Sequence, residues 1–143
     1  MTSTIHIPRL GVGAVIQNEN NEILLVLRNR SPEKGTWSIP GGKVDLYEYL
    51  ESCVIREVKE EVNLDIEVKG LLTTAETIRA EDGEHWVSVI YDTIVRSGEA
   101  CNMEKDGAIG AVRWFPIDQL PDNLACFTVP AIEKLRERAG LEK

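Results

Sequence analysis

Short runs of small and branched apolar residues alternate with polar turns along the first forty residues of the chain. Residues 10–17 and 23–28 form two such runs, and the segment between them is rich in Asn and Glu. Asn is a frequent turn residue because its side chain bonds to the nearby backbone. This pattern predicts two strands joined as a β-hairpin. A further short strand is predicted at residues 37–40, where Pro40 and a pair of glycines end it.

The apolar positions change to a helical period after residue 45. Val54, Val58 and Val62 recur every four residues, which places them on one face of a helix that would pack against the core. Asp45 and Glu48 have the spacing of a capping box, with Asp45 as the N-cap. Asn63 stands where a residue in the left-handed conformation often ends a helix. The pattern therefore predicts a helix over residues 46–62.

The second half of the chain predicts more strands and a closing helix. Strand patterns occupy residues 64–77, 86–96 and 112–115, and an amphipathic helix is predicted at residues 129–139. Residues 99–107 have no periodicity and are expected to form a loop. Strands on both sides of one helix, with a second helix at the end, favour an α/β protein with a mixed sheet covered on both faces. Without repeats or linkers, all 143 residues are expected to form one domain.

Composition and charge exclude several functional classes. The chain is 43% hydrophobic and 28% charged, as soluble globular proteins are, and it has no apolar run of the ~20 residues that a membrane span requires. The net charge is −8, and no basic stripe is present to bind nucleic acid through its phosphates. Cys53, Cys101 and Cys126 lack metal-binding spacing, and we see no export signal. We therefore expect reduced thiols in a cytoplasmic protein.

Three carboxylates share one face of the predicted central helix. Glu57, Glu60 and Glu61 fall within about 100° of arc, because positions i, i+3 and i+4 are neighbours on a helix. Like charges at this spacing destabilise an isolated helix, and a hard cation would relieve the repulsion. Mg²⁺ bound by carboxylates and substrate phosphates fits best, with Mn²⁺ as a substitute. For three glutamates alone, the alternative is a solvated acidic surface.

The glutamates belong to a longer pattern. Six residues follow the order G-x5-E-x7-R-E-Val-x-E-E-x-x-Leu, namely Gly42, Glu48, Arg56, Glu57, Glu60 and Glu61. At ordinary residue usage such a match arises by chance on the order of 10⁻⁶. The stretch resembles the Nudix box, with Asn63 and Tyr47 in two places where that box usually has Gly. The resemblance implies a Nudix fold over essentially the whole chain, an α/β/α sandwich with a central mixed β-sheet. It also implies an enzyme that hydrolyses a phosphoanhydride.

The resemblance also implies roles for single residues. The metal ions would be held by Glu57, Glu60 and Glu61, with a backbone carbonyl near Gly41 or Gly42. Arg56 would orient the carboxylates, and either Glu60 or Glu61 would be the general base. Glu48 would cap the helix, support the site, or do both. A further acidic ligand would come from the 99–107 loop, where Glu104 is the first choice and Asp106 the second; the alternative for both is a solvated loop charge.

The substrate contacts lie outside the acidic helix face. Arg28 is the first choice for binding phosphates, followed by Arg30 and Lys43, and the alternative for each is an ordinary surface cation. In similar enzymes the region of Phe127 and Thr128 contacts the base. Flanking segments are similar to the MutT-like nucleoside triphosphate pyrophosphohydrolases, which implies a (d)NTP or modified (d)NTP substrate cut to nucleoside monophosphate and pyrophosphate. Alternatives are hydrolysis of ADP-ribose or an NDP-sugar, and a non-catalytic nucleotide-sensing module. A homodimer is also implied.

Overall fold

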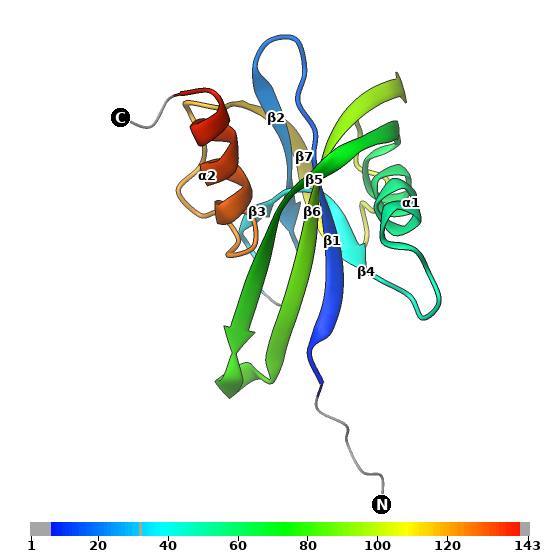
Figure 1. Cartoon of the computed structure of the whole chain (residues 1–143), viewed down its shortest axis with the longest axis vertical. Helices are drawn as coiled ribbons and strands as arrows, with labels where there is room; N and C mark the ends of the chain where they lie inside the picture. The colour runs from blue at the N-terminus through cyan, green and yellow to red at the C-terminus, as the bar shows by residue number, and fades with distance from the viewer. Residues whose placement is uncertain (1–6, 32, 141–143) are drawn as a thin grey trace, which may run out of the picture.

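The computed structural model describes residues 7–31 and 33–140, and its strands lie between two helices (Figure 1). The elements, in chain order, are β1 (Arg9–Val15), β2 (Glu22–Arg28), β3 (Trp37–Ser38), β4 (Gly41–Lys43), α1 (Leu50–Val62), β5 (Leu64–Arg79), the short 3-10 helix η1 (Ala80–Asp82), β6 (Glu84–Gly98), β7 (Ile109–Pro116) and α2 (Val129–Arg138). Within this part of the chain no helix is long and apolar enough to span a membrane.

The strands form two sheets. The larger sheet has the order β4-β1-β6-β5 and is mixed, since β1 and β6 are parallel and its other pairs are antiparallel. The smaller sheet has the order β3-β2-β7 and is antiparallel. In Figure 1, α1 and α2 lie on opposite sides of these sheets. The predicted α/β class with a mixed sheet between helices is therefore confirmed.

The hairpin predicted for the first two strands is wrong beyond its turn. The turn itself forms, with Asn18 Oδ1 accepting hydrogen bonds from the backbone of Asn20 and Glu22. Past an isolated bridge between Gln17 and Ile23, however, β1 and β2 enter different sheets. Both strands contain runs of consecutive buried residues, so each is covered on both faces. β1 instead pairs in parallel with β6, a strand far away in the sequence.

The core divides into two clusters on either side of the larger sheet. On one side Val54, Val58 and Val62 of α1 pack with Val12 of β1, as the predicted valine stripe requires. On the other side, residues of α2 pack with alternate strand positions such as Val15. Because successive strand residues point to opposite faces, β1 contributes to both clusters. The acidic face of α1 is thus left at the edge of the core.

Helix α1 begins at Leu50, not at residue 46 as predicted. Asp45 is not its N-cap: that position belongs to Tyr49, which has an extended backbone and no side-chain capping bond. Glu48 Oε1 does accept a hydrogen bond from the backbone of Asp45, but in a separate turn before the helix. Tyr47 has a φ of 69°, which interrupts the helix where the Nudix box usually has Gly. The predicted end is confirmed, because Asn63 has a φ of 65°.

Candidate active site

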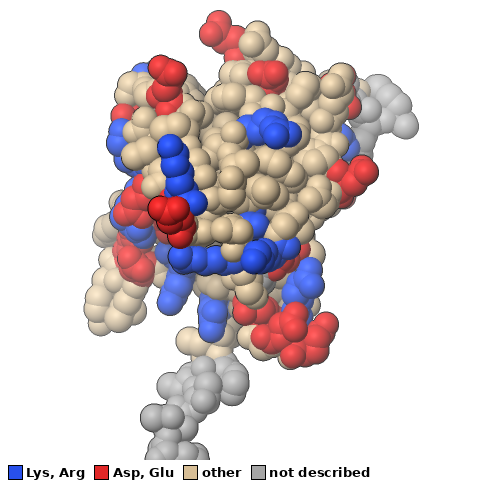
Figure 2. Space-filling model, turned by 180° about the vertical axis from the view of Figure 1, so that it is seen from behind, with Lys and Arg blue, Asp and Glu red and all other residues tan. Residues whose placement is uncertain are grey.

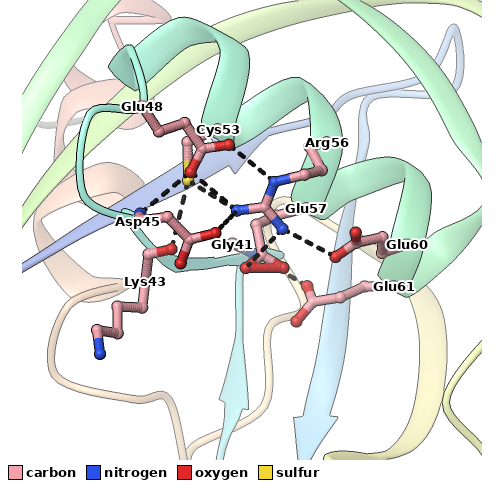
Figure 3. Close-up of polar contacts among 9 residues, drawn as sticks. All are labelled: Gly41, Lys43, Asp45, Glu48, Cys53, Arg56, Glu57, Glu60 and Glu61. Carbon is pink, nitrogen blue, oxygen red and sulfur yellow. Dashed lines mark hydrogen bonds and ion pairs between the residues drawn. The ribbon is translucent and has the colours of Figure 1, made fainter.

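Strand β4 runs beside α1 and brings a pair of glycines against two of the helix glutamates. The backbone N–H of Gly41 donates to Glu61 Oε1 at 3.1 Å. At Gly42, a Cβ atom would lie 2.0 Å from Glu57 Oε2, so only glycine leaves room for this carboxylate in its present position. Figure 3 shows the carboxylates of Glu57 and Glu61 next to the β4 backbone. The glycine pair therefore forms a cradle for two carboxylates.

Burial gives these two carboxylates unusual proton affinities. It raises the pKa of Glu57 to about 7 and that of Glu61 to about 8. Nearby negative charges add to the effect, and Glu104 contributes to both shifts. Arg56 opposes the shift at Glu57, and the N–H of Gly41 opposes that at Glu61. Two ionised carboxylates that lie side by side and are partly shielded from water are unfavourable in free energy unless a cation is bound between them.

Arg56 organises the acidic residues on the outer side of this pair. Its Nε and Nη2 donate to the two oxygens of Glu48 at 2.8 and 2.9 Å, a bidentate arrangement, and its Nη1 donates to Glu60 at 3.0 Å. These bonds lower the pKa of Glu48 to about 2 and raise that of Arg56. Glu48 thus serves chiefly as the partner of Arg56. Glu60 is half-exposed, and its carboxylate points toward Arg56 (Figure 3).

A cavity of about 270 Å³ opens beside Glu61, between the two sheets. The predicted site residues that line it are Glu61, Gly41, Gly42, Arg28, Arg30, Lys43 and Phe127. Burial lowers the pKa of Arg28, and Glu33, Glu61 and Glu84 oppose that shift. Its guanidinium carbon lies 5.8 Å from the centre of the Phe127 ring. The predicted cations and one predicted acidic residue therefore meet in one cavity.

Several lining residues were not predicted from the sequence. They are Glu33, Ser38, Thr77, Trp86 and Ser88, contributed by a loop and by strands of both sheets. All five lie outside the box pattern of Gly42 to Leu64, so that pattern could not single them out. Figure 2 shows a band of Lys and Arg side chains across one face of the molecule, although the net charge is −8. The charge is therefore unevenly distributed.

The acidic residues do not form a complete metal cage by themselves. In residues 7–31 and 33–140, no three His, Cys, Asp or Glu side chains gather closely enough to enclose an ion. The available donors are carboxylate and backbone oxygens, the ligands that hard divalent cations prefer. Such cations commonly complete their shell with water and substrate phosphates. The paired carboxylates at the glycine cradle fit this mode of binding.

Comparison with known proteins identifies the family. The model of the NUDIX domain matches residues 7–135, nearly the entire chain. The chain belongs to the Nudix family. The Nudix resemblance and fold predicted from the sequence are thus confirmed, and the matched residues include the stretch from Gly42 to Leu64.

Individual Nudix proteins are similar over much of this chain. A MutT NUDIX hydrolase from Burkholderia pseudomallei has 42% sequence identity and a TM-score of 0.85, covering 90% of this chain and 98% of that one. The ADP-ribose pyrophosphatase of Methanocaldococcus jannaschii is 36% identical over 92 residues, which are 64% of this chain and 54% of the relative. A putative 8-oxo-dGTP diphosphatase of Mycobacterium tuberculosis is 32% identical over 96 residues, 64% of this chain and 42% of the relative. This chain thus spans about half the length of such curated relatives.

Proposed function

We propose that this protein is a Mg²⁺-dependent Nudix hydrolase that cuts a nucleoside triphosphate, or a modified one, into nucleoside monophosphate and pyrophosphate. The observation that carries the proposal is the partly buried pair Glu57 and Glu61, held against a glycine cradle beside a cavity lined by Arg28 and Lys43. Partly buried carboxylates next to cations supply the two charge types that a metal–phosphate complex needs. The family and its MutT-named neighbour agree with this assignment.

The metal would be held by Glu57 and Glu61 with a backbone carbonyl near Gly42. The carboxylates of Glu60 and Glu104 would add further negative charge around the metal ion. Bound Mg²⁺ would lower the pKa of a coordinated water and neutralise the charge on the phosphates. Mn²⁺ should substitute, since the ligands are all oxygens.

Glu61 is the proposed proton acceptor. Its Oε1 accepts the N–H of Gly41, which holds the carboxylate in place beside the cavity. Glu61 lines the cavity, whereas Glu60 is held by Arg56. Between the two glutamates that the sequence leaves open, this geometry favours Glu61.

Arg28 and Lys43 would bind the phosphates. Both line the cavity with Glu61, so phosphate oxygens could contact these cations and the metal together. Arg56 would keep Glu57 and Glu60 oriented through its hydrogen bonds and its 3.8 Å contact with Glu57. In this arrangement the residues contribute mainly positioning and electrostatic stabilisation.

A second candidate substrate is a nucleoside diphosphate derivative such as ADP-ribose. The name of the Methanocaldococcus jannaschii relative favours it. The cavity volume of about 270 Å³, slightly below the roughly 300–1,000 Å³ of typical ligand pockets, suits one nucleoside unit, which both candidate substrates contain. The preference for the triphosphate therefore depends on the MutT-named neighbour. A nucleotide-sensing module without activity is a third reading, against which stands the presence of every box glutamate.

A hydrolysis panel with product analysis tests the proposal. The wild-type protein would be assayed with Mg²⁺ on dNTPs, oxidised dNTPs, ADP-ribose and NDP-sugars. We expect pyrophosphate from a triphosphate, and a large loss of kcat in Glu61→Gln. AMP from ADP-ribose, without turnover of any triphosphate, would replace this proposal with the second candidate. Tight nucleotide binding without any turnover would favour the sensing module.

A further inference from the structure

Glu33 lies in the loop between β2 and β3 with two unfavourable features. Its φ is 61°, in the left-handed region that residues other than glycine rarely adopt. Its side chain is only 5% exposed, and a buried carboxylate is tolerated only when it is paired. Such strain persists where the surrounding structure holds the residue in place, often at a functional site.

The Glu33 carboxylate joins its loop to two segments far away in the sequence. Nη2 of Arg79, at the end of β5, donates to Oε1 at 3.1 Å. The backbone N–H of Cys126 donates to Oε1 at 3.0 Å and to Oε2 at 3.2 Å. The segment before Cys126 pairs with the backbone of Trp37, and this pairing ends at Ala125. The carboxylate of Glu33 therefore accepts the hydrogen bond of the Cys126 N–H, for which the backbone pairing with Trp37 offers no carbonyl.

This contact anchors the backbone immediately before Phe127. On the other side of Phe127, Thr128 Oγ1 accepts a hydrogen bond from the backbone of Ile39 at 3.1 Å. The backbone is thus anchored immediately before and immediately after Phe127. Its ring lies near Arg28 and lines the cavity together with Glu33 and Trp86. An aromatic ring held in one position on a cavity wall is a preorganised surface for a flat ligand.

We propose that Glu33 is a positioning residue for base recognition, holding Phe127 so that the purine or pyrimidine ring of the substrate stacks on it. The inference rests on the proposed function, because it takes the ligand to be a nucleotide. Stacking on an aromatic side chain is a main source of affinity for bases in proteins. Stacking involves only the base, so Glu33 should not affect how tightly the phosphate end of the ligand is bound.

Binding measurements without metal test this inference apart from catalysis. Calorimetry would give the Kd of AMP, GMP, CMP, UMP and ribose 5-phosphate for the wild type, Glu33→Gln and Phe127→Leu. Gln keeps the size of Glu33 but offers one acceptor in place of two. The matched control is Glu67→Gln, which breaks the exposed ion pair with Arg96. Thermal unfolding would confirm that each variant is folded.

We expect the wild type to bind at least one nucleotide more tightly than ribose 5-phosphate. Glu33→Gln and Phe127→Leu should each reduce that preference about tenfold, a typical share of base stacking, and leave the Kd of ribose 5-phosphate unchanged. The double variant should be no weaker than Phe127→Leu alone, because Glu33 acts through Phe127. Glu67→Gln should change nothing.

The inference would be overturned by the absence of a nucleotide preference in the wild type, by an unchanged preference in Glu33→Gln, or by additive losses in the double variant. An equal loss of ribose 5-phosphate affinity would also do so, since it would indicate a general structural role. A different result would contradict the proposed function: preferential binding of a nucleotide together with no Mg²⁺-dependent hydrolysis.

Discussion

A methyl group added at Gly42 would meet the carboxylate of Glu57. In Gly42→Ala the new Cβ would lie 2.0 Å from Oε2 and 2.3 Å from Cδ, whereas real contacts of this kind do not fall below 3.0 Å. The carboxylate must therefore move by at least about 1 Å, the difference between these distances. Because it is the far end of a flexible side chain, rotation can accommodate the methyl group without moving the backbone.

The effect of Gly42→Ala on the free energy of unfolding should be much smaller than its effect on kcat. Replacing Gly by Ala also reduces the entropy of the unfolded chain, worth about 0.4–1 kcal/mol, so the free energy of unfolding should change by less than about 1 kcal/mol. A misplacement of about 1 Å at a reacting centre can cost on the order of 100-fold in rate. That factor corresponds to about 2.7 kcal/mol of transition-state stabilisation. Gly42→Ala should therefore remain folded and lose most of its kcat.

Gly41→Ala is the matched control at the neighbouring position. Its Cβ would lie 2.0 Å from the carbonyl oxygen of Val12 and 2.9 Å from the Cα of Gly13, both backbone atoms that cannot turn away. Overpacking of this kind costs about 1–3 kcal/mol, and here it would separate β4 from β1. The control should therefore lose stability as well as activity.

The assay combines kcat for Mg²⁺-dependent hydrolysis with chemical unfolding of both variants. Retention of wild-type kcat in Gly42→Ala would refute the reasoning, because the position of the Glu57 carboxylate would then be irrelevant to the chemistry. Equal loss of stability in both variants would refute the claim that only a side chain has to move.

Three further predictions concern the surrounding polar groups. Arg56→Lys keeps the charge but loses the bidentate bond to Glu48, so steady-state kinetics should show kcat lowered about tenfold with little change in KM; an unaltered kcat would exclude an orienting role. Without metal, stability should fall as pH rises from about 4.5 to about 8, because the raised pKa values of Glu57 and Glu61 make the folded state bind more protons than the unfolded state in that range. Melting curves at pH 5 and pH 8 check this, and Mg²⁺ should raise Tm more at pH 8; a flat profile would contradict it. Ser38→Ala removes a buried hydroxyl that has no hydrogen-bond partner in the described structure, so the free energy of unfolding should rise by about 1 kcal/mol, and a fall would reveal a partner.

The sequence alone determines those features that depend on a few neighbouring residues. The valine stripe of α1 predicts which face is buried, and Asn63 predicts where the helix ends. The shared helix face of Glu57 and Glu61 follows from helical spacing. Together with Gly42, these glutamates predict the acidic site. Local periodicity and backbone preferences suffice for such features, since they act within about one turn of helix.

Only the tertiary structure decided which distant groups meet. β1 pairs in parallel with β6, a partner far away in the sequence that no local pattern of β1 predicts. Glu60 turns toward Arg56 while Glu61 turns toward Gly41, although both lie on the same helix face. Glu33 reaches Cys126 across 93 positions. Such contacts depend on how sheets and helices pack, because hydrogen-bond partners are chosen by distance in space and not by spacing along the chain.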